Sequence, residues 1–401
     1  MSGVRLSDRE LIDWIRLIRS ERVGPRTFRG LTARFGGVRE ALDALPEVLR
    51  QSGRAGLKIA TVAAAEREME GLARLGGRFV AQADPDYPRP LLATDTAPPL
   101  IAVRGTVEIL ARPCIAIVGS RNSSASGGAF TERLAAELGR AGYAIVSGLA
   151  RGIDTRAHRA ALPTGTVAVL AGGHDRVYPS ENAGLLERLI DAGGAAVTEM
   201  PLGWEPRAQD FPRRNRIVSG LSYGTVVVEA ARRSGSLITA RLALEQGREV
   251  FAVPGSPLDP RAEGSNDLIR GGATLCAEAD HVIGVIGPIL LSPTGLVAAE
   301  RRQPTYRGQP SPLSLFEDEL WSPPPGGTSD EGWDEGAGLA TGGDTERLLS
   351  LLGPSPVLLD ELARQADLPI RSVQTALVEL EMSNLVDRHA GSVSRRVVRD
   401  A

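Results

Sequence analysis

The chain has 401 residues, of which 42% are hydrophobic, enough for at least two domains with a sizeable core. Its formal net charge of −3 excludes a protein that is strongly basic throughout and binds nucleic acid through bulk charge. No run of residues is apolar over the length that a bilayer-spanning helix needs.

The charge is distributed unevenly along the chain. No basic residue lies between Arg307 and Arg347, whereas nine acidic residues do. They are Glu317, Asp318, Glu319, Asp330, Glu331, Asp334, Glu335, Asp344 and Glu346. Without these nine charges the formal net charge changes from −3 to +6, so the remaining parts are mildly basic and one linker is acidic.

The two cysteines, Cys114 and Cys276, lie in or beside apolar runs and are interpreted as small buried hydrophobic residues. Their spacing indicates neither a zinc site nor a disulfide framework. The first ten residues lack the apolar core of a signal peptide. We therefore expect a cytoplasmic protein without membrane association.

Residues 1–80 are predicted to form a helical domain. Apolar residues recur at helical spacing from Leu11 to Ile18, and a turn at Gly24 separates them from a second stripe that starts at Phe28. Two short helices around such a turn resemble the SAM-like or helical-hairpin modules that contact nucleic-acid backbone. A packing domain or one that modulates dimerisation is the alternative.

Residues 81–287 are predicted to form an extended Rossmann-like α/β domain. After a proline-rich bridge, short β-branched runs alternate with helical stretches such as 130–140 and 185–191. Each run is nearly continuous in apolar character, as expected of strands buried on both faces. The pattern predicts a doubly wound parallel sheet with right-handed crossovers. Its expected strands are residues 114–118, 144–146, 167–170, 195–198, 225–228 and 249–253.

Two further segments complete the chain. Residues 288–343 are rich in Pro, Gly, Ser and acidic side chains and are predicted to be a disordered linker. Residues 344–401 show a winged-helix pattern. It consists of helical stretches at 348–352, 358–366 and 370–380, and a small β-wing at 385–393.

The winged-helix pattern leaves two roles open, DNA binding and protein contact. Glu379 and Glu381, near the end of the third helix, favour protein contact. Four arginines favour DNA: Arg371, Arg388, Arg395 and Arg396.

The most informative segment is Phe211-Pro-Arg-Arg-Asn-Arg-Ile217, which precedes an apolar strand. Its guanidinium groups are forked donors suited to phosphate oxygens. Its aromatic ring offers a face on which a base can stack. A solvated arginine-rich loop is the alternative, and the motifs around the segment argue against it.

Small residues follow several predicted strands. Gly119-Ser120-Arg121 follows the first strand, Ser147-Gly148 with Arg151 follows the second, and Ser234-Gly235-Ser236 with Thr239 follows the fifth. Such loops present backbone N–H groups and helix dipoles to an anion. The carboxyl edge of a parallel sheet, where they meet, is also where ligands bind. Glycine-permitted tight turns are the alternative.

Other residues near this edge receive different interpretations. Tyr178, after the third strand, either stacks on a base or closes the sheet edge, whereas Asp154 and His158 are interpreted as structural. The loops do not follow the G-x-G-x-x-G pattern of dinucleotide sites. We find no metal-ligand cluster and no nucleophile–base–acid set. The sequence therefore predicts a binding groove rather than a reaction centre, with no cofactor and no metal.

Six motifs occur together in one order. They are Gly119-Ser-Arg121, Ser147-Gly-Leu-Ala-Arg-Gly-Ile-Asp154, Tyr178-Pro179 with Asn182, Phe211-Pro-Arg-Arg-Asn-Arg-Ile217, Val228-Glu-Ala230 with Ser234-Gly-Ser-Leu-Ile-Thr-Ala240, and Val253-Pro-Gly255 with Gly264-Ser-Asn266. Over residues 85–285 the chain resembles the DNA-processing protein A family, also called DprA or Smf. The helical N-terminal segment and the winged-helix pattern also suit that family.

The resemblance implies a Rossmann-like domain that forms homodimers, binds and protects single-stranded DNA, and loads the recombinase RecA in natural transformation. A housekeeping recombination role is the alternative context. Family members often carry basic residues after the tyrosine–proline pair, where Ser180, Glu181 and Ala183 stand here. The implied phosphate and strand contacts are Gly119, Ser120, Arg121, Ser147, Gly148, Arg151, Tyr178, Asn182, Phe211, Arg213, Arg214, Asn215, Arg216, Ser234, Gly235, Ser236 and Thr239.

An enzyme is the competing interpretation. Nucleotide phosphoribohydrolases have a similar sheet and a glutamate after a comparable strand, where Glu229 stands here. Their Pro-Gly-Gly-x-Gly-Thr turn is absent, since the chain reads Leu221-Ser-Tyr-Gly-Thr225. Single-stranded DNA binding is therefore favoured over hydrolysis.

Overall fold

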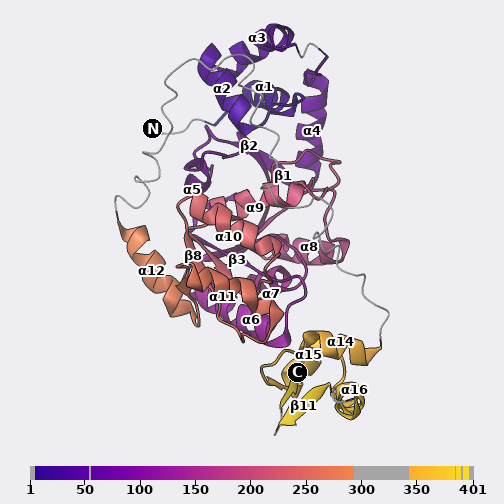
Figure 1. Cartoon of the computed structure of the whole chain (residues 1–401). Coiled ribbons are helices and arrows are strands. Elements are labelled where there is room, and N and C mark those ends of the chain that lie inside the picture. The colour runs from indigo at the N-terminus through magenta and orange to yellow at the C-terminus, as the bar shows by residue number, and fades with distance from the viewer. Residues whose placement is uncertain (1–4, 54–55, 293–342, 384, 390–391, 397–401) are drawn as a thin grey trace.

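The computed structural model describes residues 5–53, 56–292, 343–383, 385–389 and 392–396. Figure 1 shows three parts along the chain: helices near the N-terminus, a large α/β domain, and a small C-terminal module at the opposite end of the molecule. None of the helices in the described ranges has the length and apolar character needed to cross a membrane.

Four helices form the N-terminal part: α1 (Asp8–Arg19), α2 (Pro25–Phe35), α3 (Val38–Gln51) and α4 (Val62–Arg74). Ser7 begins α1 through a reciprocal capping box with Glu10, and Pro25 is placed at the start of α2, where its missing N–H costs nothing. The helices bury two cores. One joins α1, α2 and α3, and the other joins α1 and α4 to the first two strands of the sheet.

One sheet of nine strands forms the centre of the molecule, in the order β1-β2-β6-β5-β4-β3-β7-β8-β9. Strands β3 to β9 are joined by parallel pairings, whereas β1 and β2 are antiparallel additions at one edge. The bounds are β1 Gly77–Ala81, β2 Leu100–Gly105, β3 Cys114–Val118, β4 Ala144–Ser147, β5 Thr166–Val169, β6 Ala195–Thr198, β7 Gly224–Val227, β8 Glu249–Ala252 and β9 Thr274–Leu275.

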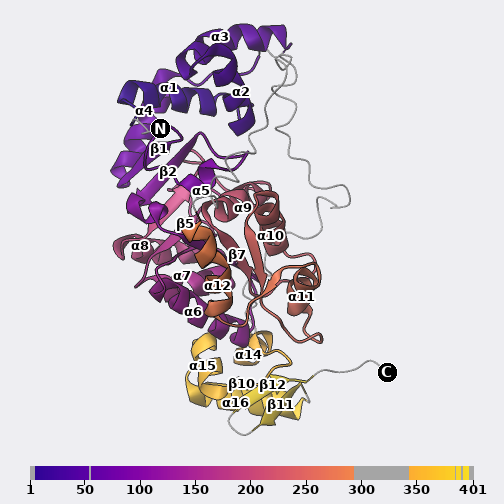
Figure 2. The ribbon, with the colours of Figure 1, turned by 90° about the vertical axis from the view of Figure 1, so that its left-hand side faces the viewer.

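Helices cover both faces of this sheet, as Figures 1 and 2 show. On one face α9 (Asp210–Leu221) and α10 (Gly235–Glu245) pack against alternate residues of the strands. On the other face lie α6 (Ala125–Arg140), α7 (Ile153–Ala161), α8 (Ala183–Asp191) and α12 (Ala279–Leu291). The central strands are buried throughout, as parallel strands covered on both sides require.

Short elements fill the connections between these layers. They are α5 (Arg89–Leu92), η1 (Val107–Ala111), η2 (Ser180–Asn182), η3 (Pro260–Ala262) and α11 (Glu263–Arg270).

The mixed α/β fold with a large parallel sheet is confirmed, and the six predicted strands are present within a residue of their expected bounds. Strands β1, β2 and β9 were not predicted from the sequence. Helix α6 begins at Ala125, five residues before the expected helical stretch 130–140, because Ser124 caps it and accepts from the N–H of Gly127. Helix α12 continues through Leu291 and includes Pro288, so the first residues of the predicted linker are helical. Residues 293–342 of that linker lie outside the described ranges.

The C-terminal module has the predicted winged-helix elements. They are α14 (Asp344–Leu351), β10 (Val357–Leu358), α15 (Leu359–Ala366), α16 (Ile370–Met382), β11 (Val386–His389) and β12 (Ser392–Arg395). A core of its own joins the helices to the small sheet, and Ala125 at the start of α6 is buried in that same core. The module therefore packs against the α/β domain in this structure.

Candidate functional site

The order of the strands defines where a site is expected. Within the sheet, β3 pairs with β4 on one side and with β7 on the other. Loops that leave β3 and β7 at their carboxyl ends diverge there, which creates the crevice in which open α/β sheets bind ligands. The loop after β3 carries Arg121, and the segment after β7 leads to α10.

Two loops at this edge and the first turn of α9 contribute a stack of one arginine and two aromatic rings. The guanidinium carbon of Arg121 lies 5.4 Å from the centre of the Phe211 ring. The centres of the Phe211 and Tyr178 rings are 5.4 Å apart, with an interplanar angle of 66°. Tyr178 is 47% exposed, so it does not close the sheet edge as a buried residue would. Sequence reasoning assigned all three residues to one site, and the structure brings them together.

Arg214, in the first turns of α9, is directed into the protein. It is 5% exposed and donates to the carbonyl oxygens of Gly148 and, at 2.6 Å, of Val169. Burial lowers its pKa to about 10, against the opposing effect of Asp154. Its donors therefore hold the ends of strands β4 and β5 together.

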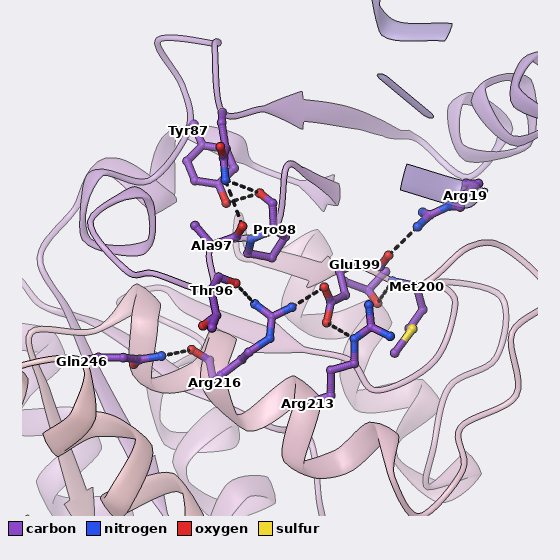
Figure 3. Close-up of polar contacts among 12 residues, drawn as sticks. Arg19, Tyr87, Thr96, Ala97, Pro98, Glu199, Met200, Arg213, Arg216 and Gln246 are labelled. Atoms are coloured by element: carbon purple, nitrogen blue, oxygen red, sulfur yellow. Dashed lines mark hydrogen bonds and ion pairs between the residues drawn. The ribbon is translucent and has the colours of Figure 1, made fainter. Parts of the chain in front are cut away.

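Figure 3 shows how Glu199 holds the other two arginines of α9. Arg213 Nε donates to Glu199 at 2.9 Å, and Arg216 donates to the second oxygen of the same carboxylate. Arg216 also donates to the carbonyl of Thr96, and the Glu199 carbonyl accepts from Arg19 of α1 at 2.9 Å. Burial acts to raise the pKa of Glu199, but the two arginines outweigh it and lower that pKa.

Arg213 and Arg216 differ in exposure although they share this partner. The side chain of Arg213 is 45% exposed and that of Arg216 only 11%. Arg213 thus reaches the surface, whereas Arg216 lies inside. The sequence predicted all three arginines to line one pocket, and the structure brings only Arg213 to the surface.

The turn after β4 satisfies its own donors. Asp154 accepts from the N–H groups of Gly148 at 3.0 Å and of Ala150 at 3.2 Å, and the hydroxyl of Ser147 donates to the Ile117 carbonyl at 2.7 Å. Burial raises the pKa of Asp154, against the effect of Arg214. Asp154 has the structural role expected of it. The donors of the Ser147–Gly148 turn already bind acceptors within the protein.

The start of α6 also holds a carboxylate of the chain itself. Glu229 accepts from the backbone N–H of Ser124 at 2.9 Å and from its hydroxyl at 2.5 Å. Burial raises the pKa of Glu229, although the Ser124 hydrogen bonds oppose this. A Cβ at Gly127 would lie 2.5 Å from the Glu229 carboxylate, so only glycine leaves room for it. In this structure Glu229, rather than a phosphate, fills the helix N-terminus that sequence reasoning assigned to an anion.

Gly119 and Ser120 lie in the loop that joins β3 to α6. A Cβ at Gly119 would lie 2.7 Å from Ile153, so the loop packs closely on α7. The Ser120 hydroxyl accepts from the N–H of Asn122 at 3.1 Å. Both residues hold the base of the loop that carries Arg121.

The start of α10 lies beside the stack. Ser234 caps this helix by accepting from the N–H of Ser236, and Asn215 Nδ2 donates to the carbonyl of Gly235 at 3.5 Å. Gly235 is exposed, whereas Ser236 and Thr239 are buried. Sequence reasoning missed the exposed Arg233, whose signal is its position directly before Ser234 in the segment that joins β7 to α10.

The loop after β4 and the turn of η2 complete the edge. Arg151 is paired there with Glu181, and the buried Asn182 donates to the carbonyl of Leu149 at 2.9 Å. Asn182 therefore holds the loop after β4 from inside the protein. Among the residues that the structure describes, no group of His, Cys, Asp or Glu side chains is arranged to hold a metal ion.

Comparison with known proteins decides the family. The sequence model of DNA recombination-mediator protein A matches residues 78–287 of the chain. The chain belongs to that family. Models of the DprA-like N-terminal HHH domain and the DprA winged helix domain match residues 8–71 and 335–392, in agreement with the two flanking parts of the fold.

Individual relatives agree with this assignment. Protein Smf of Synechocystis is 30% identical over 96% of this chain and 98% of its own length. Protein Smf of Escherichia coli is 48% identical, and the match spans 49% of this chain and about half (53%) of that protein. The X-ray structure of DNA processing protein A from Streptococcus pneumoniae is 31% identical, with a TM-score of 0.53 and coverage of 70% of this chain and 98% of that one.

Proposed function

We propose that the chain binds and protects single-stranded DNA along the carboxyl edge of its sheet, as a non-enzymatic recombination mediator in natural transformation. The observation that carries the proposal is the stack of Arg121, Phe211 and Tyr178. Ring faces beside guanidinium groups bind successive bases and phosphates without reading sequence. Membership in the family of DNA recombination-mediator protein A supports it.

The proposal divides the predicted site residues into two groups. Arg121, Arg213 and Asn215, together with the start of α10, would contact the strand directly, because their side chains or backbone reach the surface at the carboxyl edge of the sheet. Buried members such as Arg214 and Arg216 would hold the loops in place, because their donors already bind carbonyl and carboxylate oxygens. The same applies to Ser147, Gly148 and Asn182.

The hydrolase alternative depends on Glu229. Both oxygens of its carboxylate accept hydrogen bonds from Ser124, and the carboxylate lies against Gly127 at the start of α6. A general base needs an open acceptor within reach of a substrate proton. Because the Glu229 carboxylate is already hydrogen-bonded at the start of α6, this arrangement favours DNA binding over hydrolysis.

The proposal includes three finer expectations: delivery of the bound strand to RecA, a homodimer formed through the Rossmann-like domain, and a cytoplasmic location. Light scattering after size exclusion tests the dimer, which would have about twice the 42.4 kDa mass of the chain. A RecA filament assay on strands coated with single-strand-binding protein tests delivery. Absence of any acceleration by this protein would remove the RecA step from the proposal.

The central test is a fluorescence-anisotropy titration with an unstructured oligothymidine and a duplex of equal length, at low and moderate salt. Wild-type protein is expected to prefer the single strand and to lose affinity as salt rises. Arg121→Ala should weaken binding, whereas Arg133→Ala, which removes the same kind of arginine from a phenylalanine on α6, should not. Equal weakening by both variants, or no binding by the wild type, would refute the proposal.

A further inference from the structure

One arginine of the proposed DNA edge already holds a carboxylate. Arg151 Nε donates to Glu181 Oε1 at 2.5 Å, and Arg151 Nη2 donates to Glu181 Oε2 at 2.8 Å. The two side chains are 39% and 44% exposed, so solvent reaches the pair. A carboxylate bound in this way occupies the two donors that would bind two oxygens of one phosphate.

The pair is held in place from both sides. Asn182, the residue after Glu181, is buried and donates through Nδ2 to the Leu149 carbonyl at 2.9 Å and to Thr155 Oγ1 at 2.9 Å. On the other side, Asp154 accepts from the N–H of Ala150, the residue before Arg151. The backbones that carry Arg151 and Glu181 are thus joined, and little freedom is lost when the ion pair forms.

The pair also lies next to the stack. Tyr178 precedes Glu181 by three residues in the same turn and contacts Phe211. The pKa of Arg151 is raised, mainly by its hydrogen bonds with Glu181 and further by the nearby Tyr178. A strand stacked on Tyr178 would therefore place a phosphate close to Arg151 and to the negative charge of Glu181.

We propose that Glu181 acts as an internal substitute for a DNA phosphate, and that its hold on Arg151 sets the strength and salt dependence of single-stranded DNA binding. This inference rests on the proposed function, since it concerns the same edge of the sheet. A phosphate either displaces Glu181 from Arg151 or binds beside it and meets its repulsion. Both cases weaken binding relative to a chain in which Arg151 is unoccupied.

The expected size of the effect follows from the exposure of the pair. Exposed ion pairs are weak, so Glu181→Gln should tighten binding to oligothymidine by roughly three- to tenfold at low salt. If Arg151 then neutralises one more phosphate, the plot of log affinity against log salt should steepen by about 0.7. A purely structural role for Glu181 would weaken binding and leave that slope unchanged.

The chain offers a matched control. Glu187, on α8, forms a similar two-bond pair with Arg104, at 2.8 and 2.6 Å. Arg104 pairs across the sheet with Ala196 near the amino end of β6, away from the proposed edge. Glu187→Gln removes the same charge and the same kind of pair, and should leave DNA affinity unchanged.

The experiment compares anisotropy titrations of the full-length wild type, Glu181→Gln, Glu187→Gln, Arg151→Ala and the double variant Arg151→Ala/Glu181→Gln. We expect tighter binding only for Glu181→Gln, and loss of most of that gain once Arg151 is absent. Unchanged or weaker binding by Glu181→Gln, with wild-type binding intact, would overturn this inference alone. An equal gain in the Arg151→Ala background would also overturn it. A wild type that binds no single strand would instead reject the proposed function and this inference with it.

Discussion

At the scale of single residues, arginines that are adjacent in sequence serve different purposes. Arg213 and Arg214 are neighbours on α9, yet the side chain of Arg213 is 45% exposed, whereas Arg214 is buried beneath the Gly148 turn. On a helix, successive side chains point about 100° apart, so a basic run cannot present every charge to one ligand. Substitutions should therefore separate stability from binding.

Arg214→Ala is expected to lower the free energy of unfolding by about 3–5 kcal/mol, because it leaves the buried Asp154 carboxylate without its compensating charge. Urea denaturation measures this loss. Arg214→Lys should restore only part of it, since lysine keeps the charge but lacks the planar guanidinium whose Nη1 donates to both carbonyl oxygens. Arg121→Ala is the control and should leave stability unchanged while weakening DNA binding. A stable Arg214→Ala protein would show that the buried contacts contribute little.

Phe211→Ala is expected to weaken binding to single-stranded DNA by about 1–3 kcal/mol, the range for loss of one base–aromatic stack. The matched control is Phe130→Ala on α6, which removes a ring that likewise lies beneath an arginine, Arg133, at 5.3 Å. Anisotropy titration at one fixed salt concentration compares them. Equal losses in both variants would indicate a general structural effect rather than stacking at the edge.

Glu199→Gln is expected to reduce stability by about 3 kcal/mol at neutral pH, since one buried carboxylate compensates Arg213 and Arg216. The pKa of Glu199 is lowered in the folded protein, so its contribution is complete above its ordinary value of 4.5 and is lost as pH falls through the lower folded value. The difference between wild type and variant should therefore shrink at acidic pH. Glu187→Gln, at an exposed pair, should cost less than about 1 kcal/mol. A pH-independent difference would contradict this account.

At the scale of secondary-structure elements, the sequence predicted what depends on local pattern. The six apolar runs of the parallel sheet are recognisable because burial on both faces leaves almost no polar residue in them. Strands β1 and β2 lack this signal, because each includes an arginine, Arg78 or Arg104, at the antiparallel edge. Strand β9 has only two residues, Thr274 and Leu275, too few for any period to be read.

For the candidate site, too, the sequence predicted the location but not the contacts that depend on the folded chain. Loops at the carboxyl ends of parallel strands meet whatever their sequence, so the common location of Arg121, Tyr178 and Phe211 follows from topology. The topology does not predict whether a hydrogen-bond donor at this edge is open to a ligand or already has a partner within the protein. The partners of Arg214 and Ser124 are Val169 and Glu229, which are distant in sequence and become neighbours only in the folded chain.

At the scale of the whole molecule, two buried histidines make stability depend on pH. Burial lowers the pKa of His158 to about 3 and that of His174 to about 4, from the ordinary 6.5. Below pH 6.5 the unfolded chain binds protons that the folded protein does not, so stability is intact above that pH and falls toward pH 4. The slope should approach about 2.7 kcal/mol per pH unit when both sites contribute. Urea midpoints between pH 7 and 4.5 measure it, and His174→Gln should halve it. A flat profile would mean that the histidines are protonated in the folded state.

The contact between the winged-helix module and the α/β domain combines charge with close packing. Glu132 of α6 pairs with Arg156 at 3.2 Å and with Arg364 of α15 at 2.7 Å, and Arg261 donates to the Leu352 carbonyl at 3.1 Å. A Cβ at Gly128 would lie 2.9 Å from the Gln365 amide, so the helices approach closely there. Partly exposed pairs of this kind are screened by salt.

Docking of the module should therefore depend on salt and on Glu132. Glu132→Gln removes the charge between the two arginines, and the radius of gyration, measured by small-angle X-ray scattering, should rise at a lower salt concentration than in the wild type. Glu137→Gln removes an acidic residue from the same helix, one that lies away from Arg364, and should behave as the wild type does. If both variants and the wild type keep one radius from 0.1 to 1 M salt, the apolar contact around Ala125 holds the module by itself. The ion pairs would then contribute only to the orientation of α15.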